Sequence, residues 1–171
     1  MPIRPESQHD HAAIRQIHIE AFRDHPHSQQ TEHLIVEALR SAQALEISLV
    51  AEIDSGVVGH IAFSRAQVGA SESGWYLLGP VGVLPTLQRQ GLGRALIEAG
   101  LAELRSRGAL GCVLVGDPQF YGRFGFAHHP GLTCPGIPDE YVLGLTWKGS
   151  VPEGSIVYHP AFAVDPHGMM D

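Results

Sequence analysis

The chain has 171 residues, of which 44% are hydrophobic, which suits one domain over residues 1–171 with a single sizeable core. A formal net charge of −7 argues against a nucleic-acid-binding face, and no apolar run approaches the roughly 20 residues that a membrane span needs. Two cysteines are too few for a disulfide framework and are typical of buried thiols in a reducing compartment, so we expect a cytoplasmic protein without nucleic-acid or membrane partners.

The first half of the chain predicts two helices and an antiparallel meander. Apolar residues at helical spacing follow cap chemistry at Ser7, and a second helix follows Ser28 or Thr31. A hairpin turn at 54–56 then joins two strands. The expected elements are a strand over 2–5, helices over 12–23 and up to about 40, and strands over 45–53 and 57–68.

A further strand over 75–83 contains a flaw, because Gly79-Pro80 lies inside it. Proline has no N–H to donate to a strand partner, so we expect a break or bulge there. Such a break leaves nearby backbone groups free to bind an extended ligand that carries amides.

Two glycines one residue apart, Gly91 and Gly93, separate this strand from a helix that ends near Arg107. The free N–H groups of a first helical turn and the helix dipole together attract an anion such as a pyrophosphate. A P-loop would need Lys-Ser/Thr where Arg94-Ala95 stands, and a dinucleotide fingerprint would need a small residue at Leu96. On these glycines alone, a tight turn without a ligand is the alternative.

The second half predicts an apolar strand over 110–115, covered on both faces, and then a short helical segment that ends at Gly125. The rest is rich in loops, with strands over 140–147 and 155–158 and a frayed tail. Together these elements predict one α/β domain with a mixed sheet.

Two motifs resemble the GNAT N-acetyltransferase superfamily. Val81-Gly82-Val83-Leu84-Pro85 with Gln88-Arg89-Gln90-Gly91-Leu92-Gly93 resembles its acetyl-coenzyme A signature, and Gln119 to Phe126 resembles its second motif, Phe-Tyr-x-x-x-Gly-Phe. The string Gly116 to Phe126 is similar to the YhbS-like branch, and the resemblance covers essentially the whole chain. It implies the GNAT fold: a mixed, mostly antiparallel central sheet, splayed between its fourth and fifth strands, with helices on both faces.

The resemblance also implies acetyl-CoA as the acyl donor and assigns residues to it. The pantetheine arm would lie in the splay, and backbone amides of the turn would hold the pyrophosphate. The residues assigned to the coenzyme are Val81, Gly82, Val83, Gln88, Arg89, Gln90, Gly91, Leu92, Gly93, Arg94 and Asp117. Asp117 stands where many relatives carry an asparagine, so it is equally well interpreted as a turn or cap residue.

The implied reaction moves an acetyl group from the thioester to a primary amine. Tyr121 matches the family's general acid, because a phenol stays protonated at neutral pH and can donate to the departing sulfur. Many relatives carry a glutamate base on the strand before the coenzyme motif, and 75–83 has none. Glu32, His33 and His60 are base candidates by position, beside a water relay or capture of the neutral amine.

No metal is expected, because none of the histidine pairs has the spacing of a metal site.

The acidic balance favours a cationic acceptor, such as a polyamine, an aminoglycoside, a lysine side chain or a protein N-terminus. The alternative function is a coenzyme A-binding regulatory or interaction module without turnover. No motif identifies the acceptor, and the resemblance is compatible with a homodimer.

Overall fold

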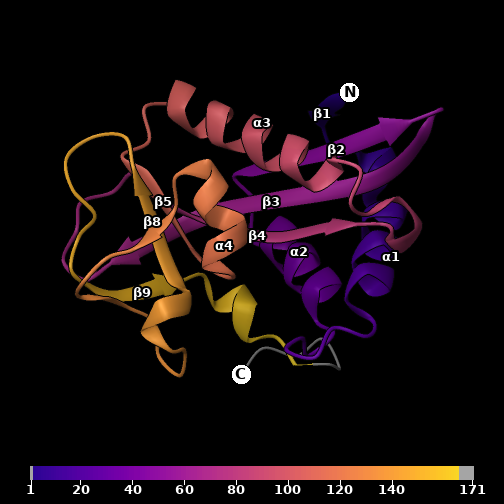
Figure 1. The fold of residues 1–171 in the computed structure, drawn as a ribbon. Helices are drawn as coiled ribbons and strands as arrows, with labels where there is room; N and C mark the ends of the chain where they lie inside the picture. Colours follow the sequence, from indigo (N-terminus) through magenta and orange to yellow (C-terminus); the bar gives the residue numbers. More distant parts are fainter. Residues whose placement is uncertain (1, 166–171) are drawn as a thin grey trace.

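A mixed sheet with helices on both faces forms the centre of the molecule (Figure 1), and the computed structural model describes residues 2–165. The strands in this range are β1 (Ile3–Pro5), β2 (Ile47–Ile53), β3 (Gly56–Val68), β4 (Trp75–Val83), β5 (Gly111–Val115), β6 (Ala127–His128), β7 (Leu132–Thr133), β8 (Val142–Thr146) and β9 (Gly154–Tyr158). The α-helices are α1 (His11–Phe22), α2 (Glu32–Ser41), α3 (Leu92–Ser106) and α4 (Pro118–Tyr121). Short 3-10 turns are η1 (Gln8–Asp10), η2 (Pro85–Leu87), η3 (Gly122–Phe124), η4 (Asp139–Tyr141) and η5 (Pro160–Ala163).

The strand order is β1-β2-β3-β4-β5-β8-β6, and β9 pairs with both β3 and β7. The pairs β4–β5 and β7–β9 are parallel, whereas the other pairs are antiparallel. The predicted mixed, mostly antiparallel sheet is therefore confirmed.

The sheet opens between β4 and β5. Their pairing begins at Trp75 and Gly111 and ends at Leu77 and Val113, so within residues 2–165 the second half of β4 pairs with no strand on that side. The register of β4 against β3 shifts at the same place, opposite Ile61 to Phe63. The splay and the break at Gly79-Pro80 were both predicted, and both are confirmed.

Apolar side chains fill both faces of the sheet. Helix α3 covers one face, where Phe63, Leu96 and Leu104 are buried, and α1 and α2 cover the other (Figure 1). A Cβ on Gly100 would overlap the Phe63 ring, so this glycine lets α3 approach the sheet closely. None of the helices described is long and apolar enough to cross a membrane.

The prediction of a frayed tail after Tyr158 is wrong for the part of the tail that the structure describes. The turn η5 packs Ala161 and Val164 against Ile35 and Leu39 of α2, and all four side chains are buried. Residues 166–171 of the predicted tail lie outside the described residues. The two-residue strands β6 and β7 were not predicted, because a strand this short leaves no periodic pattern.

Candidate functional site

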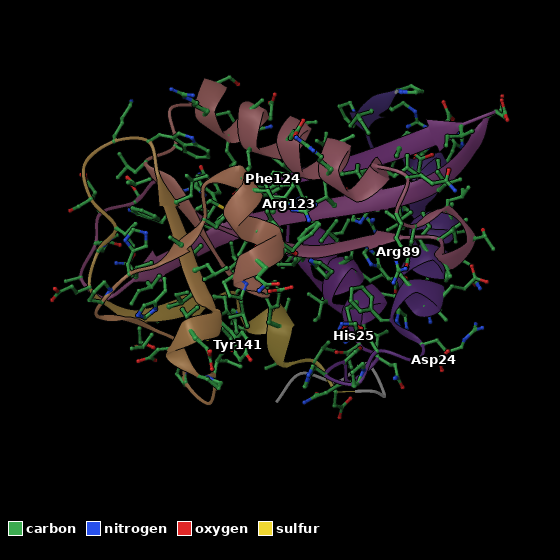
Figure 2. The ribbon with its side chains drawn as sticks, in the orientation of Figure 1. Asp24, His25, Arg89, Arg123, Phe124 and Tyr141 are labelled. Carbon is green, nitrogen blue, oxygen red and sulfur yellow. The ribbon has the colours of Figure 1, made fainter. Side chains whose placement is uncertain are left out.

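A cleft of about 730 Å³ opens where β4 ends. The carboxyl half of β4, the start of α3 and the end of α1 form its walls, and Phe120 and Arg123 close it from the segment after β5. Figure 2 shows Arg89 above His25 on one side of the molecule, with Arg123 nearer its centre. The residues that line the cleft are Ala21, Phe22, His25, Val81, Gly82, Val83, Gln88, Arg89, Gly91, Gly93, Arg94, Ile97, Phe120 and Arg123.

The glycine turn presents backbone N–H groups to this cleft. Helix α3 begins at Leu92, and its first intrahelical bond runs from Ala95 N to Gly91 O over 3.0 Å. The N–H groups of the first turn therefore have no intrahelical acceptor, and they lie at the positive end of the helix dipole. Gly91 has a φ of +86°, and no atom lies within 4 Å of where its Cβ would be. Arg89, a non-glycine residue, also has a positive φ of +64°.

The edge of β4 presents a second set of backbone groups. Leu84 N donates to Val58 O on β3 over 3.0 Å, and alternate residues of a strand point their N–H and C=O groups to opposite sides. The groups of Val81 and Val83 consequently face away from β3, toward the splay. The Gln88 side chain donates from Nε2 to Val83 O over 3.0 Å, which leaves Val81 and the Val83 N–H for an extended ligand.

Unpaired N–H groups at a helix start, next to an unpaired strand edge, fit a molecule that carries a pyrophosphate and an arm with amides. Acetyl-CoA has both parts. The missing side chain at Gly91 keeps the cleft open between them.

Tyr121 lies over the end of β5 and packs in a cluster of aromatic rings. Its ring centroid is 5.0 Å from that of Phe120, which lines the cleft, and a Cβ on Gly116 would lie 2.5 Å from its Cε2. Burial, with a smaller contribution from the charge of Asp117, raises the pKa of Tyr121 to about 12. The phenol is thus protonated at neutral pH.

The cleft brings together Val81, Gly82, Val83, Gln88, Arg89, Gly91, Gly93 and Arg94 of the predicted coenzyme residues. The other three lie outside its wall. Gln90 is exposed, Leu92 is buried in the core, and Asp117 caps α4, where its Oδ1 accepts from Gln119 N over 2.9 Å.

The sequence did not point to the α1 side of the cleft. Phe22 and His25 come from the end of α1, and Arg123 lies with its guanidinium 6.0 Å from the centroid of the Phe120 ring. Arg123 stands inside the second motif but had no role assigned to it. For Phe22 and His25 the only available signal was the helix end before Pro26.

None of the three base candidates lines the cleft. Glu32 accepts a hydrogen bond from Ser28 Oγ over 2.8 Å. Partial burial, with a smaller contribution from the charge of Arg15, lowers the pKa of His33. His60 is fully buried and its Nδ1 lies 2.8 Å from Nε2 of His18. Within residues 2–165 no group of three His, Cys, Asp or Glu side chains is placed to hold a metal ion.

Comparisons with known proteins agree with this geometry. A family model described as "Acetyltransferase (GNAT) family" matches residues 11–126. The uncharacterized N-acetyltransferase YhbS of Escherichia coli (strain K12) is 33% identical over 159 residues, which cover 84% of this chain and 90% of that protein.

Two solved structures share the fold over most of the chain. A GNAT family acetyltransferase from Brucella melitensis in complex with acetyl-CoA is 48% identical with a TM-score of 0.84, covering 94% of this chain and 97% of that one. The Escherichia coli YhbS structure in complex with CoA is 32% identical with a TM-score of 0.82, covering 94% of this chain and 91% of that one.

Proposed function

Because the chain belongs to the acetyltransferase (GNAT) family, a class of acetyl-CoA-dependent enzymes, we propose that it transfers an acetyl group to a primary amine with Tyr121 as general acid. One observation carries the proposal: a helix start with free N–H groups and an unpaired strand edge open onto the same cleft. The complexes of the two related proteins with acetyl-CoA and CoA support the choice of donor.

Backbone groups hold the coenzyme in this proposal. The N–H groups from Gln88 to Arg94 bind the pyrophosphate, and Val81 and Val83 pair with the pantetheine amides in place of a strand. Arg89 and Arg94 add positive charge at the mouth of the cleft. When bound, the thioester supplies the acetyl group and a thiolate as the leaving group.

The protein's own groups stabilise the charges that develop during transfer. A backbone N–H at Val81 or Val83 donates to the oxygen of the tetrahedral intermediate, and Tyr121 donates its phenolic proton to the departing sulfur. Because the pKa of Tyr121 is raised to about 12, the phenol is fully protonated and available as a donor across the neutral range.

The acceptor in this proposal is a small-molecule or peptide amine that is cationic in water. The net charge of −7 attracts such a molecule, and the α1 wall of the cleft offers the Phe22 ring for its apolar part. The first test is thiol release from acetyl-CoA with spermidine, an aminoglycoside, a lysine peptide and a peptide with a free N-terminus. Turnover with one or more amines is expected. Coenzyme binding without turnover on the whole panel would favour a CoA-binding module instead.

The role of Tyr121 is tested by Tyr121→Phe, which removes one hydroxyl and keeps the packed ring. We expect kcat to fall by about 10²- to 10³-fold, while the Kd for acetyl-CoA stays within about twofold of the wild-type value. Tyr141→Phe is the matched control, because Tyr141 is exposed and lies away from Arg89 (Figure 2). An unchanged kcat in Tyr121→Phe would refute the assignment.

A further inference from the structure

A chain of hydrogen-bonded polar side chains runs through the α1 side of the molecule. His18 Nε2 of α1 lies 2.8 Å from His60 Nδ1 of β3, and His60 Nε2 lies 2.8 Å from Ser48 Oγ of β2. Ser48 Oγ in turn donates to Glu6 Oε1, in the segment between β1 and η1. We call Glu6, Ser48, His60 and His18 the polar chain. Its two imidazoles are buried, with 1% and 0% of their surface exposed.

The ionised end of the polar chain is Glu6. Burial would raise the pKa of its carboxyl, but hydrogen bonds from Arg40 and Ser48 outweigh burial and hold that pKa below its ordinary value. Arg40 donates to both carboxylate oxygens over 2.9 Å. Glu6 also lies 3.1 Å from Nε2 of His11, whose side chain is 43% exposed, so this end of the polar chain reaches solvent.

The carboxylate fixes the direction of every hydrogen bond in the polar chain. It can only accept, so the Ser48 hydroxyl donates to it and has no proton left for His60. His60 therefore donates from Nε2 to Ser48 and accepts at Nδ1 from the Nε2–H of His18. Because each imidazole is neutral, the Nδ1 of His18 carries a lone pair; burial lowers the pKa of both histidines.

That lone pair has no hydrogen-bond partner and lies behind the wall of the cleft. His18 Nδ1 is a buried nitrogen without a partner, and it lies 3.0 Å from where a Cβ on Gly82 would be. Gly82 lines the cleft between Val81 and Val83, the residues that face the splay with their backbone groups. Buried polar atoms in proteins nearly always have a hydrogen-bond partner, so an unpaired one needs an explanation. Here the unpaired nitrogen lies beside Gly82, a residue of the cleft wall, which is where a proton acceptor for the bound amine would be needed.

We propose that Nδ1 of His18 accepts the proton that the acceptor amine loses, and that His60, Ser48 and Glu6 pass a proton on to solvent. The proposal rests on the proposed function and adds the missing base to it. Because Nδ1 of His18 is buried behind Gly82, the proposal has the proton reach it through one water beside Gly82, which is within the reach of a general base.

The proton and electron balance closes. The amine first loses one proton to solvent and attacks in its neutral form. Its nitrogen then forms the C–N bond with its lone pair, the C–S bond breaks, and Tyr121 protonates the sulfur. The ammonium proton goes to His18 Nδ1, the Nε2 proton of His18 to His60, the Nε2 proton of His60 to Ser48, and the Ser48 proton to Glu6. Glu6 then loses a proton to solvent and Tyr121 regains one. The two imidazoles now carry their protons on Nδ1, and proton exchange with solvent returns both to the Nε2–H tautomer before the next turnover.

The test uses His18→Gln and Ser48→Ala in the full-length enzyme, with the amine from the panel that the wild type acetylates best. We expect kcat to fall about 100-fold in His18→Gln and about tenfold in Ser48→Ala, with the KM for acetyl-CoA within twofold of the wild-type value. Ser64→Ala is the matched control, because Ser64 is a buried hydroxyl on β3 outside the polar chain. It should keep the wild-type kcat.

A pH profile separates a proton acceptor from a packing residue. The groups that face the two imidazoles are each other, His33 and Arg40 of α2, and Ser48 with Glu6. Burial lowers the pKa of His18, so its Nδ1 is unprotonated near pH 6.5. The wild-type kcat should therefore not depend on the protonation of this base at that pH. In His18→Gln, kcat should instead rise about tenfold per pH unit, since hydroxide replaces the base.

Each outcome decides between the two proposals. A wild-type enzyme without turnover on any amine overturns the proposed function and this inference with it. A wild-type kcat and pH profile in both His18→Gln and Ser48→Ala overturn this inference alone. If His18→Gln does not fold, Ser48→Ala still decides, since it leaves both imidazoles in place and removes one hydroxyl of the polar chain.

Discussion

The two sides of the cleft differ in the groups that form them: backbone groups on the α3 side and side chains on the α1 side. On the α3 side, Gly91, the first turn of α3 and the free edge of β4 present backbone groups to the cleft. On the α1 side, the side chains of Ala21, Phe22 and His25 line the cleft. Behind this wall lies the polar chain, whose members Glu6, Ser48, His60 and His18 meet from four separate parts of the sequence. A site made of backbone depends on glycines and a helix start that stand together in the sequence. A site made of side chains depends on the sheet that brings its members together.

The largest expected difference between the two walls is their response to acid. The folded-state pKa of His18 and His60 is lowered by burial, to about 3 for His60, whereas both histidines take up a proton near pH 6.5 in the unfolded chain. The unfolded state therefore binds more protons, and stability falls as pH falls below 6.5. The expected loss is about 1.4 kcal/mol per pH unit for each of the two histidines. His33, whose pKa burial also lowers, adds to it.

Urea unfolding at several pH values between 6.5 and 4.5 measures this slope, above the range where most carboxyl groups titrate. His60→Gln should remove about half of the slope, whatever it does to stability at pH 7. His9→Gln, which removes an exposed histidine of η1, should leave the slope unchanged. A wild-type slope in His60→Gln would mean that the buried imidazoles are not the source of the acid sensitivity.

The α3 side of the cleft could be predicted from the sequence better than the polar chain, because its residues are neighbours in the sequence and those of the polar chain are not. The turn at Gly91 and Gly93 and the flaw at Gly79-Pro80 are local, so the break in β4 could be predicted from the residues themselves. The splay was implied by the resemblance to the GNAT family, and the family membership is confirmed. In the polar chain, His18 and His60 lie 42 residues apart in the sequence, and no local pattern links them. The sequence assigned no role to His18. His60 was one of three base candidates, and its partners became apparent only with the register of β2 on β3.

Gly91→Ala tests whether the α3 wall depends on backbone shape. The substitution places a Cβ in open space inside the cleft and forces a non-glycine residue to a φ of +86°, which costs about 1–2 kcal/mol. We expect the Kd for acetyl-CoA, measured by calorimetry, to rise at least tenfold. The matched control is Gly108→Ala at the other end of α3, where φ is +82° and the space is equally open. Both variants should lose similar stability, and equal Kd values for the two would argue against a coenzyme site at Gly91.

The smallest expected effect concerns the charged side chains of the same wall. Arg94 lines the cleft, but its Nε donates to Glu98 over 2.8 Å and its side chain is 64% exposed, so solvent screens its charge. Arg94→Ala should raise the Kd for acetyl-CoA only about twofold, and 0.5 M salt should remove this difference. Arg107→Ala breaks the same kind of i,i+4 pair, 3.0 Å from Glu103, at the C-terminal end of α3 and away from the cleft. It should leave the Kd unchanged. A tenfold rise in Kd for Arg94→Ala would mean that side-chain charge, rather than the backbone of the turn, supplies most of the coenzyme affinity.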